Sequence, residues 1–302
     1  MARVSIRSYG EFQDYWNEEL SGAFPAGVHL LYRGHAKPDY QNRPTLLRDG
    51  LSLEEALQYE QLIHKYFLQS INCHGFIGGT KLRPNKANST YINIWRYLAQ
   101  ERHLGLPSRL LDWSMNWRVA LYFAVNNPCH HEFDGHIWVL PSFTHWTESE
   151  NELFKQIRSR FLHISASNED EAIIDTHDPF NPDMMILLHY SHYRPDMFPQ
   201  HAEDRRSIQG GKFITYENNR LLSPLEKHRI GKLMWQVSIP ADAKPDILRE
   251  FYSKGITDDF VVPPLPVKTI KVLENIKSRA LHDLYEPNKK GCFPSWLSFI
   301  KQ

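Results

Sequence analysis

The sequence contains little cysteine and no long apolar run. Its 302 residues include three cysteines, Cys73, Cys129 and Cys292, which are widely separated and do not form a disulfide framework. An odd count without regular spacing is typical of a reducing compartment. No run of about 18 apolar residues occurs, and the N-terminal segment lacks the apolar region of a secretory signal. These absences predict a soluble, cytoplasmic protein without a membrane partner.

The sequence also lacks net charge. Lys and Arg total 35, and Asp and Glu total 35, so the chain has no overall basic field of the kind that many nucleic-acid-binding proteins use. Aromatic residues make up 13% of the chain and are spread from end to end, which argues against extended disorder. A nucleic-acid partner would therefore need a local basic patch.

Common catalytic and metal-binding signatures are missing as well. The chain has no G-x-S-x-G, G-x-x-x-x-G-K-[ST], H-E-x-x-H or G-x-G-x-x-G motif, which excludes simple esterase, P-loop and zinc-protease sites. Its best metal candidates are the segments CHH (129–131) and HYSH (189–192). Adjacent histidines do not readily converge, and strand residues three apart face opposite sides. We therefore predict no bound metal.

Helices are predicted mainly in the first half of the chain and strands in the second. Two capping boxes, Ser8-x-x-Glu11 and Ser52-x-x-Glu55, each begin a predicted helix. Further helices are expected at 91–105, 117–127, 150–162, 245–255 and 267–286, and strands at 28–34, 108–114, 135–141, 184–191, 211–217 and 232–240. No repeat or low-complexity linker divides the chain, so we predict one α+β domain over residues 1–302, with a mixed β core and helical decoration.

The segment GLPSRLLDWSMNWRVALYFA (105–124) places charged residues against an apolar run. Ser114 stands just before a helix that begins near Asn116, where hydroxyl and backbone N–H groups can hold an anion or a sugar. Asp112 is a candidate for the same site. An equally good alternative is that Asp112 pairs with Arg109 and ties the strand down.

Two further segments place arginine close to glycine. Arg33 ends the apolar run of LLYRGH (30–35), where its guanidinium can point into a cleft and bind phosphate; the alternative is a surface carboxylate partner. In RRSIQGGKF (205–213), Arg205 and Gln209 precede two glycines, which permit close approach to a ligand or form a tight turn.

Residues 205–232 are locally basic and are interleaved with aromatic residues. Phe213, Tyr216 and the nearby Trp235 are candidates for stacking on unpaired bases. The alternative is a solvated basic edge of a sheet. The basic residues of this stretch are Arg205, Arg206, Lys212, Arg220, Lys227, Arg229 and Lys232.

Together these segments resemble the FRG domain, a family named for its Phe-Arg-Gly signature. The matching segments are YRG (32–34), GLPSRLLDWS (105–114), NWRVALYFA (116–124), RRSIQGGKF (205–213) and GIT (255–257). The resemblance covers residues 30–275, flanked by an N-terminal helix and a C-terminal tail. Tyr32 replaces the signature phenylalanine, Ser108 the usual threonine, and Arg102 a glutamine.

The family occurs in bacterial and phage-defence contexts, and its layout is similar to the ADP-ribosyltransferase fold. The resemblance therefore implies an NAD-dependent ADP-ribosyltransferase that acts on a macromolecule as a toxin or antiphage effector, with a neutralising antitoxin protein as partner. In this fold an arginine on the first core strand binds NAD, a later strand ends in a Ser/Thr motif, and an A-x-x-F-A helix follows. Arg33, Ser114 and the segment ALYFA (120–124) match these three features.

The resemblance implies a cleft in which Arg33, Asp112, Ser114 and Arg205 converge on NAD as substrate. Cleavage of the nicotinamide–ribose bond needs cations for the diphosphate, an aromatic face for nicotinamide and hydrogen bonds to the ribose. The implied cofactor-binding residues are Arg33, Gly34, Arg109, Trp113, Tyr122 and Arg205. The implied catalytic residues are Asp112, Ser114, Gln209 and Glu217.

The catalytic carboxylate and the acceptor are left open by the sequence. Gln209 can hold a ribose hydroxyl but cannot act as a base, so either Asp112 or Glu217 is the carboxylate or the domain binds without reacting. We expect RNA or single-stranded DNA as the acceptor, because the basic stretch 205–232 should border the cleft. The alternatives are a non-catalytic nucleotide or nucleic-acid binding module and an interaction domain of a defence system.

Overall fold

The described part of the chain is built around one mixed sheet. The computed structural model describes residues 4–20, 29–48, 50–74, 91–141, 161–164, 177–188, 211–262 and 264–286. Within them, eight strands follow the order β1-β8-β4-β2-β3-β7-β6-β5. Neighbours are antiparallel except for β1–β8 and β5–β6. The strands are β1 (Val4–Ser5), β2 (Leu30–His35), β3 (Leu111–Ser114), β4 (Gly135–Pro141), β5 (Phe161–Ile164), β6 (Met185–Leu188), β7 (Gly211–Thr215) and β8 (Trp235–Ile239).

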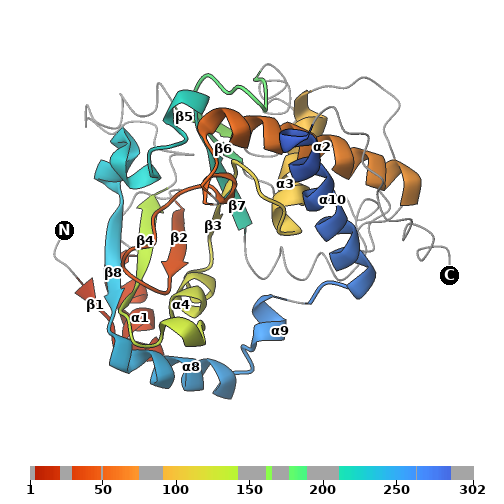
Figure 1. Cartoon of the computed structure of the whole chain (residues 1–302). Helices are drawn as coiled ribbons and strands as arrows, with labels where there is room; N and C mark the ends of the chain where they lie inside the picture. Colours follow the sequence, from red (N-terminus) through yellow and green to blue (C-terminus); the bar gives the residue numbers. More distant parts are fainter. Residues whose placement is uncertain are drawn as a thin grey trace.

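The helices form two groups around this sheet, as Figure 1 shows. One group lies beside β8, β4 and β2, and the other beside β3, β7 and β6. The first contains α1 (Tyr9–Tyr15), α4 (Trp117–Val125) and α8 (Lys244–Ser253), and the second contains α2 (Leu53–His74), α3 (Tyr91–His103) and α10 (Val267–Tyr285); the short α9 (Asp258–Val261) lies between α8 and α10 along the chain. A mixed sheet with helices confirms the predicted α+β class.

The helix ends follow the local sequence. Ser52 Oγ accepts a hydrogen bond from Glu55 N at 3.3 Å, and Glu55 Oε2 accepts from Ser52 N at 2.9 Å, which is the predicted capping box of α2. Asn116 caps α4 by accepting from Arg118 N at 3.1 Å. Gly255 takes a φ of 74° just after α8, where a side chain would be strained. Capping signals therefore located these boundaries.

Side chains alternate between two large apolar clusters across the sheet. On β2, Leu31 is buried on one side with Ile63 of α2, and Tyr32 is buried on the other with Tyr122 of α4 and Phe251 of α8. This period of two places successive side chains on opposite faces. The sheet therefore separates the α2–α10 side from the α1–α4–α8 side.

Gly34 allows helix α4 to approach strand β2 very closely. A Cβ atom at this position would lie 1.8 Å from the carbonyl oxygen of Ala120. No side chain fits in that space, so glycine is required here for helix–sheet packing. This contact places the N-terminus of α4, and Ser114 before it, beside the C-terminal part of β2.

Several boundaries differ from the sequence prediction. Phe161 and Leu162 begin strand β5 instead of ending a helix, and the remainder of that predicted helix lies outside the described residues. The segment before β8, 229–233, is a 3₁₀-helix, so the strand starts only at Trp235. Strand β1 was not predicted, because two residues carry too little pattern. In the described part of the chain no helix is long and apolar enough to cross a membrane.

Candidate functional site

A cavity of about 790 Å³ lies where strands β2 and β3 separate. The two strands pair only through Tyr32 and Ser114. Beyond that pair, the carbonyl oxygen of Asp112 accepts a hydrogen bond from Arg33 Nη1 at 2.5 Å. The Arg33 side chain thus bonds to the backbone of β3 where the pairing of the two strands ends. The volume of the cavity is in the range of small-molecule sites, about 300–1,000 Å³.

Positive side chains outnumber carboxylates around this cavity. The two carboxylates among its described lining residues are already paired: Asp39 with Lys37 Nζ at 3.0 Å, and Asp112 with Arg102. The excess of positive charge favours an anionic ligand. The cationic residues that line the cavity are Arg33, Arg43, Arg48, Arg102 and Lys212.

Arg33 presents unused hydrogen-bond donors to the cavity. Its Nη1 donates to Asp112 O, and its Nε donates to His35 Nε2 at 3.2 Å. A guanidinium has five N–H donors, so three form no hydrogen bond to a described residue and can serve a ligand. Burial lowers the pKa of Arg33 to about 9, opposed by the Asp112 carboxylate and assisted by Arg48 and Arg102. The group is still charged at neutral pH.

His35 holds Arg33 in place as a neutral imidazole. Its Nδ1 lies 3.2 Å from Tyr40 O and 3.2 Å from His136 Nε2, while its Nε2 accepts from Arg33. Burial and the Arg33 charge keep the pKa of His35 well below its ordinary value, and burial lowers the pKa of His136 to about 4, with Lys244 adding to it. A proton on His35 Nε2 would break its bond to the guanidinium.

Asp112 pairs with Arg102, not with Arg109. Arg102 Nε lies 2.8 Å from Asp112 Oδ2, and its Nη2 contacts the same oxygen. This pair corrects the alternative in which Arg109 ties the strand down. The Asp112 side chain is 40% exposed, so one carboxylate in the cavity is accessible, but its charge is shared with Arg102.

Ser114 uses its hydroxyl to close the turn into α4. Its Oγ accepts from Asn116 N at 2.9 Å and lies 3.1 Å from Asn116 O, to which it donates. The residue is 6% exposed and lines the cavity. It lies at the predicted place, but its hydroxyl proton is already used within the protein.

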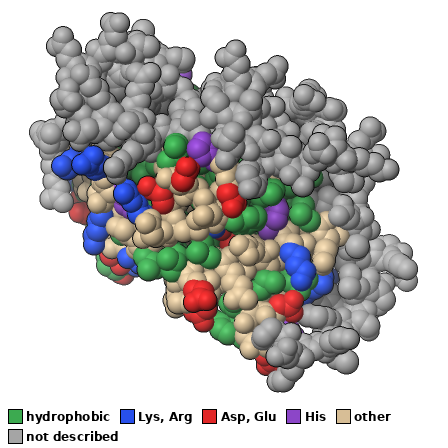
Figure 2. All heavy atoms as spheres, turned by 90° about the horizontal axis from the view of Figure 1, so that it is seen from above, with side chains coloured by type: hydrophobic (Ala, Val, Ile, Leu, Met, Phe, Trp, Pro, Cys, Tyr) green, Lys and Arg blue, Asp and Glu red, His purple; other side chains and the backbone are tan. Residues whose placement is uncertain are grey.

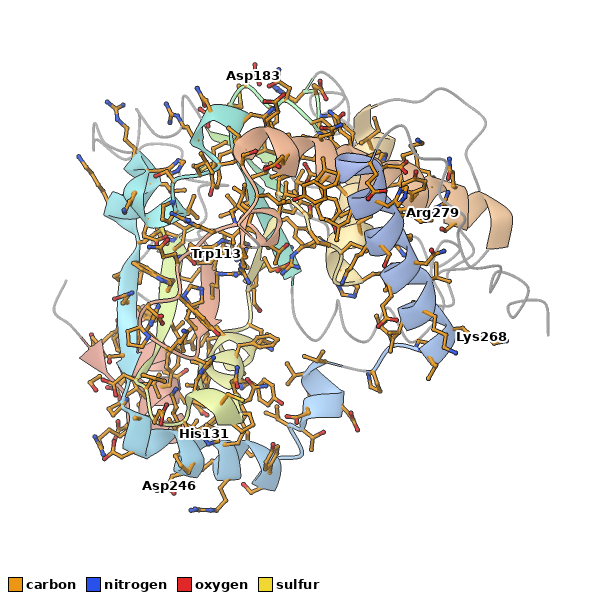
Figure 3. All side chains as sticks on the ribbon, viewed as in Figure 1. Trp113, His131, Asp183, Asp246, Lys268 and Arg279 are labelled. Atoms are coloured by element: carbon orange, nitrogen blue, oxygen red, sulfur yellow. The ribbon has the colours of Figure 1, made fainter. Side chains whose placement is uncertain are left out.

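Trp113 lines the cavity from the core side. It is 2% exposed, packs in the α2–α10 cluster and pairs with Lys212 across the β3–β7 ladder. Figure 3 shows it near the middle of the molecule, far from Lys268 and Arg279 on α10. Two better exposed aromatic rings also line the cavity, Phe123 at 37% and Tyr40 at 40%.

Arg109 does not reach the cavity, which corrects its predicted cofactor-binding role. It is fully buried, and Glu60 of α2 accepts from its Nε at 2.6 Å and from its backbone N at 2.7 Å. Asn218 Oδ1 accepts from its Nη1 at 2.8 Å. The guanidinium therefore joins α2, the start of β3 and the segment after β7, and it has a structural role.

Tyr122 and Glu217 also lie away from the cavity. Tyr122 is fully buried in the apolar cluster between α4 and α8, in edge contact with Phe251 at 5.8 Å between ring centroids. Glu217 precedes a 3₁₀-helix and lies 3.6 Å from Arg220 Nε. Neither residue lines the cavity where the sequence placed it.

The remaining predicted residues divide into two groups. Gly34 lines the cavity, but the close approach of α4 already explains why it is glycine. Arg205 and Gln209 lie outside the described residues. The predicted convergence is therefore found for Arg33, Asp112 and Ser114.

Two of the three aromatic residues predicted to stack on bases are buried, and the third, Trp235, is half-buried. Tyr216 is 0% exposed and Phe213 7%, because both pack into apolar clusters, and Lys212 is 3% exposed. On the face seen in Figure 2, Lys and Arg side chains lie close to acidic ones and form no extended basic surface among the coloured residues. Burial therefore removes Phe213 and Tyr216 from that prediction.

Sequence reasoning did not single out His35, Arg43 and Arg48, and it placed Lys212 only within the basic stretch expected to border the cleft, although all four line the cavity. The signal for Lys212 was a lysine inside the apolar strand segment GKFIT, where a charge is exceptional. Arg43 and Arg48 flank a three-residue 3₁₀-helix (Thr45–Leu47) after β2, which is too short for a periodic pattern to predict their direction. Within the described ranges, no three His, Cys, Asp or Glu side chains are grouped so that they could hold a metal ion.

The comparison with known families agrees with the sequence motifs around this cavity. No curated protein and no solved structure is significantly similar to the chain. The model of the FRG domain matches residues 28–133, which include β2, α2, α3, β3 and α4 and thus Arg33, Arg102 and Asp112. The match is shorter than the resemblance expected over residues 30–275. The chain therefore contains an FRG domain, at residues 28–133.

Proposed function

We propose that the cavity binds NAD and that the protein is an ADP-ribosyltransferase with an ADP-ribosyltransferase-like layout of its sheet. The observation that supports this most is Arg33, a guanidinium with three N–H donors that no described residue occupies, in a cavity rich in other cations. Arginine binds the oxygens of a diphosphate through several directed hydrogen bonds. The carboxylates of the cavity are already paired, so the anion that complements Arg33 is supplied by the ligand.

The proposed reaction transfers ADP-ribose to a macromolecule. The bond between C1′ of the ribose and the nicotinamide nitrogen breaks, nicotinamide leaves with the electron pair, and an acceptor nucleophile bonds to C1′ and loses its proton. Asp112 is the carboxylate placed to stabilise the positive charge that develops on the ribose. Phe123 and Tyr40 provide the partly exposed rings on which nicotinamide can stack, in place of Tyr122.

The first test measures NAD binding and nicotinamide release. In Arg33→Ala the affinity for NAD should fall about 10- to 100-fold, the range for a lost charge-assisted hydrogen bond of about 1.5–3 kcal/mol. Titration calorimetry measures the affinity, and chromatography the free nicotinamide. Arg249→Ala is the matched control, because this arginine on α8 is 76% exposed and outside the cavity. Equal NAD affinity in both variants would contradict the proposal.

The proposed biological role is that of a toxin or antiphage effector. Expression of the wild type should then slow growth, Arg33→Ala should relieve the effect and Arg249→Ala should not. A neutralising antitoxin would be recovered with the wild-type protein and would restore growth when it is co-expressed. If wild type and Arg33→Ala slowed growth equally, or not at all, the proposed toxic role of the cavity would be contradicted.

We propose RNA or single-stranded DNA as the acceptor. This proposal is supported by Arg43 and Arg48, two basic residues that line the cavity, and not by the buried aromatic residues. Phosphate contacts by Arg43 and Arg48 would be weakened by salt. Separate incubation of labelled NAD with RNA, DNA and cell protein tests this. Label found only in protein would contradict the acceptor proposal.

A second candidate is a nucleotide-binding module without chemistry. The observation that favours it is that Asp112 is paired with Arg102 and that Glu217 lies outside the cavity. In that case NAD would bind with Arg33-dependent affinity and no nicotinamide would form. The variant Asp112→Asn distinguishes a transferase from a binding module. If Asp112 is a catalytic carboxylate, this variant should still bind NAD but should no longer release nicotinamide.

A further inference from the structure

Lys212 is a buried cation without an anionic partner among the described residues. It lies on β7, is 3% exposed and lines the cavity. In the described part of the chain its side chain forms no hydrogen bond or ion pair. Burial alone lowers its pKa to about 8. An uncompensated buried charge is costly, and it is usually retained where a ligand supplies the missing partner.

The other buried lysine shows what a structural role requires. Lys244 is 0% exposed, and its Nζ donates to Ala36 O at 2.5 Å and to His130 O at 2.8 Å. These bonds join α8 to the residue that follows β2 and to the 3₁₀-helix before β4. Lys212 has no comparable contacts to described residues, so the fold described around it does not explain its charge.

Lys212 and Arg33 are separate positive centres in one cavity. Arg33 is on β2 and Lys212 on β7, with β3 between them, so the two cations reach the cavity from strands that are not neighbours. Two cations that enter one cavity from different strands can each bind an anionic group of the ligand.

We propose that Lys212 binds a second, separate phosphate of the nucleotide ligand, so that the cavity prefers a ribose-phosphorylated dinucleotide, NADP, over NAD. This inference rests on the proposed function, in which Arg33 binds the diphosphate. NADP carries a ribose phosphate apart from its diphosphate, so it supplies one anionic group for Arg33 and another for Lys212. Both described cavity carboxylates, Asp39 and Asp112, are paired elsewhere and do not neutralise Lys212.

Titration calorimetry with NAD and NADP tests the proposal. At pH 7 the wild type should bind NADP about tenfold more tightly than NAD, because one ammonium–phosphate contact is worth about 1.4 kcal/mol or more. Lys212→Gln should reduce this ratio to about one. Lys227→Gln, which removes an exposed lysine outside the cavity, should keep it.

A second variant and a pH series separate a ligand contact from a structural effect. Lys212→Arg keeps the positive charge and should keep the preference for NADP. As the pH rises from 7 to 10, the preference of the wild type should fall because Lys212 loses its proton, whereas that of Lys212→Arg should not. The other charged or titratable groups among the described cavity residues are common to both proteins: Arg33, Arg43, Arg48, Arg102, Asp39, Asp112, His35, His103, Tyr32 and Tyr40.

The outcomes distinguish this inference from the proposed function. Arg33-dependent binding of NAD without any preference for NADP would overturn the role of Lys212 and leave the proposed function standing. A preference for NADP that survives in Lys212→Gln would also overturn it. Failure of the wild type to bind either dinucleotide would overturn both.

Discussion

At the scale of single residues, the two buried lysines have opposite effects on the stability of the fold. Lys244 donates to two backbone carbonyls, so its charge is part of the fold. Lys212 is buried without such acceptors among the described residues. The same residue type therefore stabilises the free protein at one position and destabilises it at the other.

Methionine substitutions should separate these two cases. Lys212→Met should raise the free energy of unfolding by about 1–3 kcal/mol, because an apolar side chain replaces an unpaired buried charge. Lys244→Met should lower it by about 2–4 kcal/mol, because the carbonyls of Ala36 and His130 lose this donor. Urea denaturation of the two variants measures both effects. A clear loss of stability in Lys212→Met would indicate a structural partner.

The pH dependence of stability gives the same test with a defined sign. The pKa of Lys212 is about 8 in the folded protein, below the unfolded value of about 10.4. Between these values the unfolded chain binds more protons, so the stability of the wild type should rise with pH relative to Lys212→Met. Parallel curves from pH 8 to pH 10 would contradict this.

At the scale of elements, the position of the cavity depends on how α4 packs on β2. Gly34 lets the helix backbone lie against the strand, and Asn116 caps the first turn of α4. Ser114 closes the turn between β3 and α4. This close packing, the helix cap and the turn together place the end of β3 and the start of α4 next to Arg33.

Gly34→Ala should disrupt this packing severely. Its Cβ would lie 1.8 Å from Ala120 O, and the contact is with backbone, which cannot move without displacing α4. We expect a loss of about 3 kcal/mol or more, measured by thermal or urea unfolding. Gly211→Ala on β7 is the control, because a Cβ at that position would have no atom within 4 Å. Equal stability of both variants would argue against the close approach of α4.

At the scale of the whole molecule, two buried histidines make the fold sensitive to acid. His35 and His136 are each 5% exposed and lie on adjacent strands β2 and β4. Burial is the main cause of their lowered pKa values, with neighbouring positive charges adding to it. Both are therefore neutral in the folded protein at neutral pH, and folding opposes their protonation.

Acidification should destabilise the protein between pH 6.5 and pH 4. The pKa of His136 is about 4 when folded and about 6.5 when unfolded, so in this interval the unfolded chain binds more protons and stability falls as pH falls. His136 accounts for roughly 2–3 kcal/mol of this loss, at about 1.4 kcal/mol per pH unit. His136→Asn should flatten the dependence, and substitution of the exposed His29 by Asn should not. An unchanged slope in His136→Asn would contradict the assignment.

The sequence by itself determined the local features of this protein. Two capping boxes located the starts of α1 and α2, and Asn116 located the start of α4. Apolar patterns located most of the other described helices and strands, because these signals depend on neighbours along the chain. The motifs around Arg33 and Asp112 also indicated the FRG domain. What these signals share is that a few consecutive residues are sufficient to produce them.

Only the tertiary structure decided which charged groups meet. Arg109 has its partner in Glu60, 49 positions earlier, and Asp112 has Arg102 on α3, so the pairing suggested by proximity in sequence is wrong. Lys212 enters the cavity because β7 pairs with β3, which lies far from it along the chain. Partners of this kind depend on strand order and on how α2, α3 and α4 pack on the sheet, and no local pattern encodes them.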